Sequence, residues 1–298
     1  MPATDFDFNA WSVARLERIE QSLSLWVGRD APAALGEAMR YAVLDGGKRL
    51  RPLLVLAAAE AAQGQAQAAM RAACAVELIH AYSLVHDDMP CMDNDVLRRG
   101  KPTVHVKYGE AGALLAGDAL QAQAFELLTP EDDGVAALVQ ARLCRLLARA
   151  AGCAGMAGGQ AIDLASVGIK LDEAQLREMH RLKTGALLEA SVLMGAACGE
   201  LAPVTRQALA DYGAAIGLAF QVVDDILDVT ADSGTLGKTA GKDVEQDKPT
   251  YVSIHGLEAS RAHAQALRAQ AHAALDASGL SDTRALRALA DMVVDRVN

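Results

Sequence analysis

Residues 75–93 read AVELIHAYSLVHDDMPCMD and carry an apolar helical stretch directly into a cluster of acids. The apolar residues recur at three- and four-residue spacing, which is the period of an α-helix. The same spacing continues almost throughout the chain, where Ala, Leu, Glu, Arg and Gln are abundant and β-branched residues show no sustained alternation. The sequence therefore predicts an all-α protein, and residues 1–298 are expected to form one domain.

About ten or more helices are expected, separated by short breaks and one long polar segment. Ser281 and the pair Asp172 and Glu173 mark two helix starts, because capping groups and negative charge suit a first turn. The polar segment Ala231–Thr250 is expected to be a mobile loop, since similar helical pattern flanks it. Breaks are expected at Gly46–Gly47, Gly100–Pro102, Thr129–Pro130 and Gly155–Gly159. The expected helices are Trp11–Val27, Ala31–Leu44, Arg51–Gln63, Ala68–His86, Ala113–Leu128, Gly134–Ala151, Leu171–Cys198, Pro203–Val229, Leu257–Ala277 and Ser281–Arg296.

The composition favours a soluble globular protein and argues against several functions. The net charge of -10 disfavours nucleic acid as a partner, because such binding depends on neutralising phosphates. Charged residues such as Glu60, Asp118 and Glu189 interrupt the apolar runs before they reach the roughly 18 residues of a membrane span. No stable membrane insertion is expected, and an N-terminus unlike a secretory signal indicates a cytoplasmic protein. The five cysteines form no C-x-x-C pair, so neither a disulfide framework nor a zinc site is indicated.

Two acidic motifs, at 87–93 and 224–228, each follow an apolar stretch. In the second, Asp224 and Asp228 are four positions apart, so both carboxylates lie on one helix face, with Gln221 one turn earlier. Two such clusters facing each other suggest a metal cage. Hard cations such as Mg²⁺ bind carboxylate oxygens together with substrate phosphates. We therefore expect a polyphosphate substrate that carries an apolar tail.

The first motif has a longer spacing, because Asp87 and Asp93 are six positions apart. Pro90 disfavours helix at Met89 and removes a backbone donor, so the chain can turn and bring Asp93 back toward Asp87. Solvated surface charge would explain one acidic cluster, but it explains two clusters after apolar helices poorly. The sequence thus predicts that both motifs converge on a metal.

Two nucleotide- or cation-binding alternatives fail on single residues. A calcium loop starting at Asp93 would have Leu97 at a ligand position and would lack the glycine at its sixth position. A P-loop ending in residues 237–239 would have Asp232 where a glycine is required, and it would follow a helix rather than a strand. Both alternatives are rejected.

Two basic clusters lie beside the acids in this acidic chain. In the stretch GGKRLRP, residues 46–52, a glycine turn leads into Lys48 and Arg51, which could clamp one diphosphate. The second cluster is RRGKP, residues 98–102. His80 lies two turns before the first acids and so on the same helix face, where it could donate to a phosphate.

These motifs together resemble the short-chain trans-prenyl diphosphate synthases, most closely the bacterial farnesyl diphosphate synthases. The resemblance covers nearly the whole chain, and Val96 is a departure, since relatives often have a further aspartate there. It implies an all-helical bundle around a central cavity, of the isoprenoid synthase type, in a homodimer that uses three Mg²⁺ ions, with Mn²⁺ as an alternative metal. The matching stretches are GGKRLRP, HDDMPCMDND with LRRGKPTVH, GGQAID at 158–163, LKTGAL at 182–187, FQVVDDILD at 220–228, GKTAGKD and DKPTY.

The resemblance also implies the roles of individual residues. Isopentenyl diphosphate would be held by Gly47, Lys48, Arg51, His80 and Arg99. The allylic diphosphate would be held by Arg98, Lys183, Thr184, Gln221, Lys238 and Lys248. Mg²⁺ would be bound by Asp87, Asp93 and Asp224. The expected catalytic set is Asp87, Asp88, Asp93, Asp224, Asp225, Asp228, Lys183 and Arg98.

The implied reaction condenses isopentenyl diphosphate with dimethylallyl and then geranyl diphosphate to give (2E,6E)-farnesyl diphosphate and diphosphate. Cations would stabilise the departing diphosphate, and an apolar cavity would keep water from the allylic carbocation. Chain length is expected to depend on Tyr82 and Ser83, five and four positions before Asp87. In the family an aromatic residue at the former position resembles the C15 type.

Other activities remain open at this point. A geranylgeranyl or geranyl diphosphate synthase is the main alternative. A non-catalytic modulating subunit is less favoured because both aspartate motifs are complete. A terpene cyclase would not need Lys48, Arg51 and His80.

Overall fold

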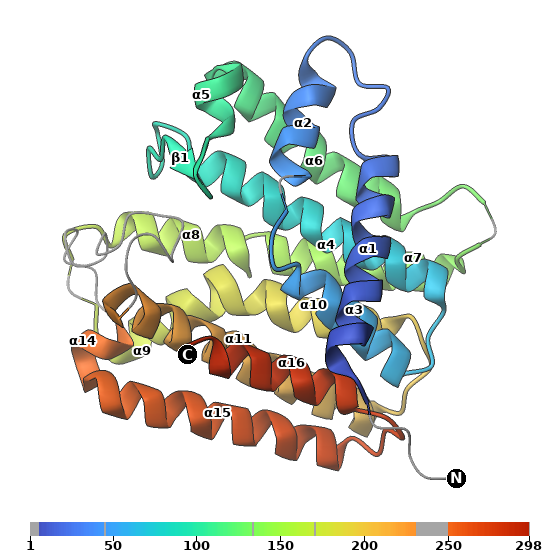
Figure 1. Cartoon of the computed structure of the whole chain (residues 1–298), viewed down its shortest axis with the longest axis vertical. Coiled ribbons are helices and arrows are strands. Elements are labelled where there is room, and N and C mark those ends of the chain that lie inside the picture. Colours follow the sequence, from blue (N-terminus) through green and yellow to red (C-terminus); the bar gives the residue numbers. More distant parts are fainter. Residues whose placement is uncertain (1–5, 45, 133, 170, 231–249, 298) are drawn as a thin grey trace.

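The computed structural model consists almost entirely of α-helices, as the sequence predicts (Figure 1). It describes residues 6–44, 46–132, 134–169, 171–230 and 250–297. The main helices are α1 (Phe8–Trp26), α2 (Leu35–Val43), α3 (Leu50–Ala61), α4 (Ala66–Asp87), α6 (Glu110–Leu128), α7 (Ala137–Ala151), α8 (Met156–Ala165), α9 (Glu173–His180), α10 (Ala186–Ala197), α11 (Pro203–Thr230), α15 (Leu257–Ala277) and α16 (Arg284–Val294). The short elements are α5 (Val104–Tyr108), α14 (Tyr251–His255), the π-helical turn η1 (Arg181–Gly185), the 3₁₀ turn η2 (Asp295–Val297) and a hairpin of β1 (Leu97–Arg98) and β2 (Lys101–Pro102).

Helix α4 is a core helix, packed against α3, α6 and α10. By length and composition it could cross a membrane, which corrects the expectation that no apolar run is long enough. However, 78% of its apolar window is buried inside the protein, as in the core helix of a soluble fold. Its burial therefore accounts for its hydrophobicity, and it ends at Asp87, where the first acidic motif begins.

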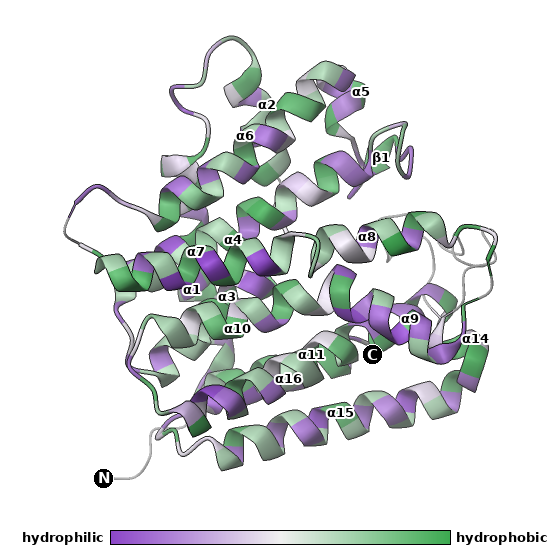
Figure 2. Ribbon diagram, turned by 180° about the vertical axis from the view of Figure 1, so that it is seen from behind, coloured by the Kyte–Doolittle hydropathy of each residue, from purple (hydrophilic) through white to green (hydrophobic). Residues whose placement is uncertain are grey.

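Helix α11 carries the second acidic motif and packs between α10 and α15. Tyr212 is fully buried in α11 and donates a hydrogen bond of 2.7 Å to the carbonyl of Leu286 in α16. Figure 2 shows hydrophobic residues toward the interior of the bundle and hydrophilic ones along the outside of α9 and α15. The two acidic motifs are thus mounted on two rigid, well-packed helices.

The expected helices are all found, with shifted ends and two local differences. The pair Asp172 and Glu173 marks the start of α9 as predicted, and Asp172 is its N-cap, with a capping box to Gln175. Helix α16 begins at Arg284 rather than near Ser281. The range expected to form one helix from Leu171 is interrupted by the π-helical turn η1.

The expected break at Gly155–Gly159 is found earlier, at Gly152–Gly155, because α8 already begins at Met156. A Cβ atom on Gly159 would lie 2.2 Å from the backbone nitrogen of Lys183, and one on Gly158 would lie 2.0 Å from the Cys153 carbonyl. These glycines therefore allow close backbone approach instead of ending a helix. The expected loop at 231–250 lies, except for Thr250, outside the described residues.

Candidate active site

A cavity of about 390 Å³ lies between the C-terminal part of α4, helix α8 and the π-helical turn η1. Its wall combines charged and apolar side chains, so it suits a ligand with an anionic head and an apolar tail. It brings together predicted residues from both diphosphate sites and both predicted chain-length residues. The lining residues are Arg51, His80, Tyr82, Ser83, Leu84, His86, Asp87, Met92, Met156, Ala157, Gln160, Ala161, Leu164, Lys183 and Thr184.

The first acidic motif turns as predicted at the end of α4. The backbone nitrogen of Asp93 donates to the carbonyl of Asp87 at 2.8 Å, and that of Asn94 donates to the carbonyl of Met89 at 3.1 Å. The turn therefore returns Asp93 to Asp87. Burial raises the pKa of Asp87 to about 6, and the neighbouring Asp93 adds to this effect while Lys183 opposes it.

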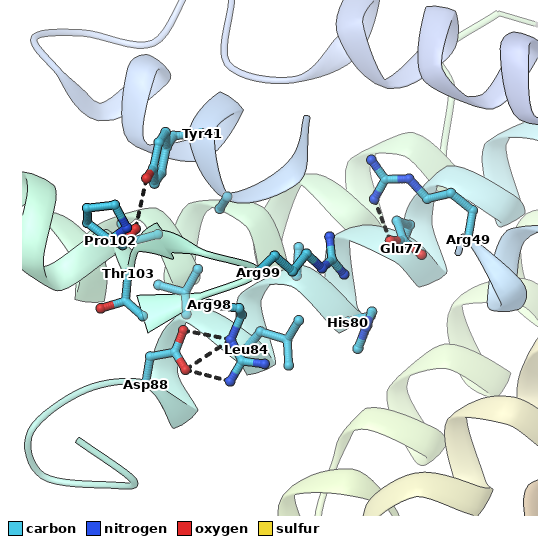
Figure 3. Close-up of a pocket in the computed structure, with 14 residues that line it drawn as sticks. Tyr41, Arg49, Glu77, His80, Leu84, Asp88, Arg98, Arg99, Pro102 and Thr103 are labelled. Carbon is cyan, nitrogen blue, oxygen red and sulfur yellow. Dashed lines mark hydrogen bonds and ion pairs between the residues drawn. The ribbon is translucent and has the colours of Figure 1, made fainter. Parts of the chain in front are cut away.

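Asp88 occupies a second, smaller hollow beside the hairpin (Figure 3). Its side chain is buried and pairs with the Arg98 guanidinium, with the Oδ1–Nη2 distance at 2.5 Å and the Oδ2–Nε distance at 2.9 Å. This pair of predicted catalytic residues is therefore internally neutralised. Arg98, expected to hold the allylic diphosphate, has a carboxylate as its partner in this structure.

The predicted isopentenyl diphosphate residues gather around His80, which lines both hollows. Burial lowers the pKa of His80 well below its usual range, and Arg51 and Arg99 lower it further. Within the described residues, the buried Nε of Arg51 has no hydrogen-bond partner. Such an unsatisfied cationic donor costs free energy, which an anionic ligand would recover. The concentration of positive charge and the donor both fit a diphosphate.

The glycine turn before α3 has a direct steric role at this cationic cluster. A Cβ atom on Gly47 would lie 2.9 Å from Arg99 Nη1, and the same guanidinium donates to the carbonyl of Gly46. Lys48 is exposed beside it. The pKa of Lys48 is lowered by partial burial and by Arg296, and Asp224 opposes this. The turn therefore places Lys48 of the first basic cluster close to Arg99 of the second, and within charge interaction of Asp224 in the second acidic motif.

Arg49 is a residue whose role the sequence did not indicate. Its guanidinium is buried and lies 2.6 Å from Glu77 of α4 and 2.7 Å from Glu20 of α1 (Figure 3 shows the first contact). Its backbone adopts a left-handed conformation with φ of 47° just before α3. Arg49 thus anchors the basic loop, leaving its neighbours to face a ligand.

The second acidic motif is divided between different partners. Asp224 accepts from Nη2 of Arg296 at 2.8 Å. Asp225 accepts from Gln221 at 2.9 Å, and Gln221 in turn accepts from Thr184 at 3.2 Å. Asp228 is buried. The structure thereby connects three of the predicted residues in one chain of hydrogen bonds.

Arg296, at the C-terminal end, was missed by sequence reasoning. Its Nε and Nη1 atoms are buried and make no hydrogen bond in the described part of the chain. The guanidinium also stacks 4.4 Å from the centre of the Phe220 ring. A single arginine at the end of the last predicted helix gives no sequence signal for a partner, because only tertiary packing brings it to Asp224.

Lys183 is held at the cavity wall by a carboxylate on α8. Its Nζ lies 2.6 Å from Oδ2 of Asp163, the last residue of the GGQAID stretch. Burial lowers the pKa of Lys183, but Asp163 and the more distant Asp87 outweigh it, so the net pKa is raised. Lys183 therefore stays cationic, and its charge interacts with Asp87 and Asp93 of the first acidic motif.

The aspartates do not form a preassembled metal-binding site. Within the described ranges, no cluster of three or more His, Cys, Asp or Glu is arranged to hold an ion. Asp88 and Asp224 are instead each paired with an arginine. The donor set still fits Mg²⁺. Asp87 and Asp93 offer carboxylate oxygens, and a divalent cation would relieve the desolvation and repulsion that raise the pKa of Asp87.

Tyr82 lies in the wall of the cavity and is 9% exposed. Its ring packs edge-on against His86 with 5.7 Å between the ring centres. His86 Nε2 lies 3.2 Å from the carbonyl of Leu114 in α6, and a Cβ atom on Gly117 would overlap this imidazole. Tyr82 therefore packs against a histidine that itself contacts α6.

Two predicted residues, Lys238 and Lys248, lie outside the described residues. Their predicted contacts with the allylic diphosphate stay predictions.

The fold is an all-α bundle with two acidic motifs, a cluster of arginines and a partly apolar cavity. These features define a protein that binds a diphosphate whose other end is apolar. The profile of the Polyprenyl synthetase family matches residues 32–285. The chain belongs to this family of prenyltransferases.

Individual relatives differ in the product that they are named for. Geranylgeranyl pyrophosphate synthase 9 of Arabidopsis thaliana, a chloroplastic protein, is 48% identical over 98% of this chain and 82% of its own. A solved FPP/GFPP synthase from Zymomonas mobilis is 42% identical, with a TM-score of 0.84 and coverage of 96% and 98%. The geranyltransferase of Helicobacter pylori, solved with magnesium and isoprenyl diphosphate, is 35% identical, with a TM-score of 0.84 and 99% coverage of both chains.

The comparisons confirm the predicted family. They do not single out the bacterial farnesyl diphosphate synthases within it, since the curated relatives include geranylgeranyl diphosphate synthases.

Proposed function

We propose that this prenyltransferase condenses isopentenyl diphosphate with dimethylallyl and geranyl diphosphate and releases farnesyl diphosphate. The observation that carries the proposal is the cavity that joins a polar end, with the Arg51 guanidinium and the His80 imidazole, to an apolar wall that contains Tyr82. The Helicobacter pylori relative, solved with magnesium and an isoprenyl diphosphate, supports the substrate class.

The cationic and neutral polar side chains of the site would bind and orient the two diphosphates. Arg51, His80 and Arg99 would hold the isopentenyl diphosphate, and Lys183 with Thr184 would hold the allylic diphosphate. Mg²⁺, bound by Asp87, Asp93 and Asp224, would supply the main charge neutralisation on the departing diphosphate. Three ions per site are proposed, with Mn²⁺ as a substitute.

The apolar wall protects the reactive intermediate. When the C–O bond of the allylic diphosphate breaks, the electron pair leaves with the diphosphate and an allylic cation remains. The double bond of isopentenyl diphosphate attacks that cation, and a proton is then lost, for which the released diphosphate is the proposed acceptor. Leu84, Met156 and Leu164 exclude the water that would otherwise form an alcohol.

The proposed product of fifteen carbons rests on the position of Tyr82. The ring is buried and packs against His86, so it would limit the depth available to a growing chain. Ser83, beside it, is partly buried and leaves space. The proposal assigns the length limit to the tyrosine ring.

A second candidate, geranylgeranyl diphosphate synthase, is favoured by the curated relatives, which carry that name at 46% and 48% identity. On the comparisons alone it is the better supported product. The two candidates share the chemistry and differ only in the number of condensations.

The test is a product analysis with purified protein, Mg²⁺, labelled isopentenyl diphosphate and each allylic starter in turn. The dephosphorylated alcohols are separated by chain length. The proposal expects C15 from the wild type, C20 from Tyr82→Ala, and C15 from the matched control Tyr82→Phe, which keeps the ring. A wild type that makes C20 supports the second candidate, and a wild type that makes no product contradicts the activity.

We also propose that the protein is a cytoplasmic homodimer. The exposed side chains Leu114 and Leu115 on α6, at 48% and 56% exposure, support an apolar contact between two copies. Sedimentation of the purified protein tests the dimer. Asp87→Ala separates an enzyme from a modulating subunit, because it should abolish turnover but leave an effect on a partner intact.

A further inference from the structure

Asp225 is placed differently from the aspartates on either side of it in the second motif. It is 3% exposed, and both of its carboxylate oxygens accept hydrogen bonds. Oδ1 accepts from Nε2 of Gln221 at 2.9 Å, and Oδ2 accepts from the backbone nitrogen of Tyr251 at 2.8 Å. On the helix it lies about 100° around the axis from Asp224.

The partner of Oδ2 is the first amide of helix α14. The initial amides of a helix have no intrahelical acceptor, so they need one from elsewhere. Thr250 supplies one acceptor in a capping box with Ser253, and Asp225 supplies another to Tyr251. Asp225 therefore ties the beginning of α14 to α11, across 26 positions in the sequence.

The other end of this network reaches the cavity. Gln221 donates to Asp225 and accepts from the hydroxyl of Thr184, which lines the cavity. On the far side, the Tyr251 ring packs 5.9 Å from His180 of α9, which directly precedes η1. Asp225 thus sits at the centre of contacts that connect α11, α14 and the turn carrying Lys183.

We propose that Asp225 is a positioning residue, not a metal ligand: it orients Gln221 toward Thr184 and anchors the start of α14 to α11. The kinetic part of this inference rests on the proposed function. A carboxylate that is buried and accepts from two fixed donors would lose both contacts if it turned to coordinate an ion. Asp224 is partly exposed and is the residue of the motif to which the resemblance gives the metal.

An asparagine can fulfil the same role, whereas an alanine cannot. In Asp225→Asn the amide oxygen still accepts from the Tyr251 nitrogen, and the Gln221 amide can reverse to accept from the new NH₂ group and donate to Thr184. In Asp225→Ala both donors lose their acceptor in a buried place, which is costly. A metal ligand would be damaged by both changes, because the amide lacks the charge that Mg²⁺ prefers.

The experiment uses the full-length protein with Asp225→Asn and Asp225→Ala, and with Asp224→Asn as the matched neighbour. Two quantities are measured: the Mg²⁺ concentration for half-maximal activity, and hydrogen exchange of the amides at 251–255 without Mg²⁺. We expect Asp225→Asn to keep the wild-type Mg²⁺ dependence within about twofold and to keep the amides protected. Asp225→Ala should lose amide protection at least tenfold and raise KM for the allylic diphosphate.

Asp224→Asn should do the reverse, raising the Mg²⁺ requirement at least tenfold with the amides still protected. The inference is overturned if Asp225→Asn raises the Mg²⁺ requirement as much as Asp224→Asn does, or if Asp225→Ala leaves the amides protected. Should the wild type have no prenyltransferase activity, the proposed function fails, and the exchange measurement still decides the anchor.

Discussion

Removal of Glu77 should destabilise the protein strongly, because it leaves a buried charge with less compensation. The side chains of Arg49 and Glu77 are 2% and 5% exposed, and the Nη1–Oε1 distance is 2.6 Å. Arg49 also donates to Glu20 and to the carbonyl of Val43, each at 2.7 Å. Glu77→Ala keeps these two contacts and deletes the buried one.

The size of the effect follows from burial. Removing one partner of a buried ion pair costs about 3–5 kcal/mol. Glu20 remains as a counter-charge, but it is 40% exposed and so screened by water. The expected loss in the free energy of unfolding is therefore about 3 kcal/mol. That is a large part of the roughly 5–15 kcal/mol that stabilises a typical fold.

Chemical denaturation followed by circular dichroism measures this loss from the midpoint and the slope. The matched control is Glu20→Ala, which should cost about 1 kcal/mol or less. The double variant Arg49→Met with Glu77→Leu should recover most of the loss, since apolar residues can replace a buried ion pair. The reasoning fails if Glu77→Ala costs no more than Glu20→Ala, or if the double variant is no better than the single one.

Three further outcomes are expected. Burial lowers the pKa of His180 to about 4, so the unfolded chain binds the proton more readily and stability falls as the pH drops from 6.5 to 4. His180→Gln should weaken the pH dependence of the unfolding free energy between pH 7 and 4.5, and an unchanged pH dependence would contradict this. Gly159→Ala should cost about 1–3 kcal/mol in denaturation because its Cβ would meet the Lys183 backbone at 2.2 Å, whereas a neutral effect would show that α8 can shift freely. Asp163→Asn should raise KM for the allylic diphosphate more than that for isopentenyl diphosphate, because Lys183 loses its charged anchor; equal changes in steady-state kinetics would argue against that role.

The long helices were predictable because their apolar spacing is strong and the packing agrees with it. The failures occur where tertiary contacts override local preference. Gly158 and Gly159 suggested a break, yet they lie within α8. Glycine is needed there because neighbouring backbone comes too close for any side chain. The short helices α5 and α14 contain too few residues to show a period.

The candidate site was predictable in its composition but not in its pairing. Spacing and Pro90 correctly predicted that Asp93 returns to Asp87. The partner of Asp88, by contrast, depends on the hairpin that presents Arg98, and the partner of Asp224 depends on how the packing of α16 and η2 places Arg296. Such pairs join residues that no periodic pattern relates, so only the folded structure reveals them.

The π-helical turn at Arg181–Gly185 lets one continuous helical segment serve two separate hydrophobic clusters. A π-turn inserts one extra residue, which rotates everything after it by about 100°. Before the turn, Leu176 and Met179 pack with Leu171 in a small cluster of their own. After it, Leu187 and Leu188 enter the main core. Deleting a single residue there would rotate one half of the segment relative to the other. The apolar side chains that the segment contributes to one of the two clusters would then face solvent.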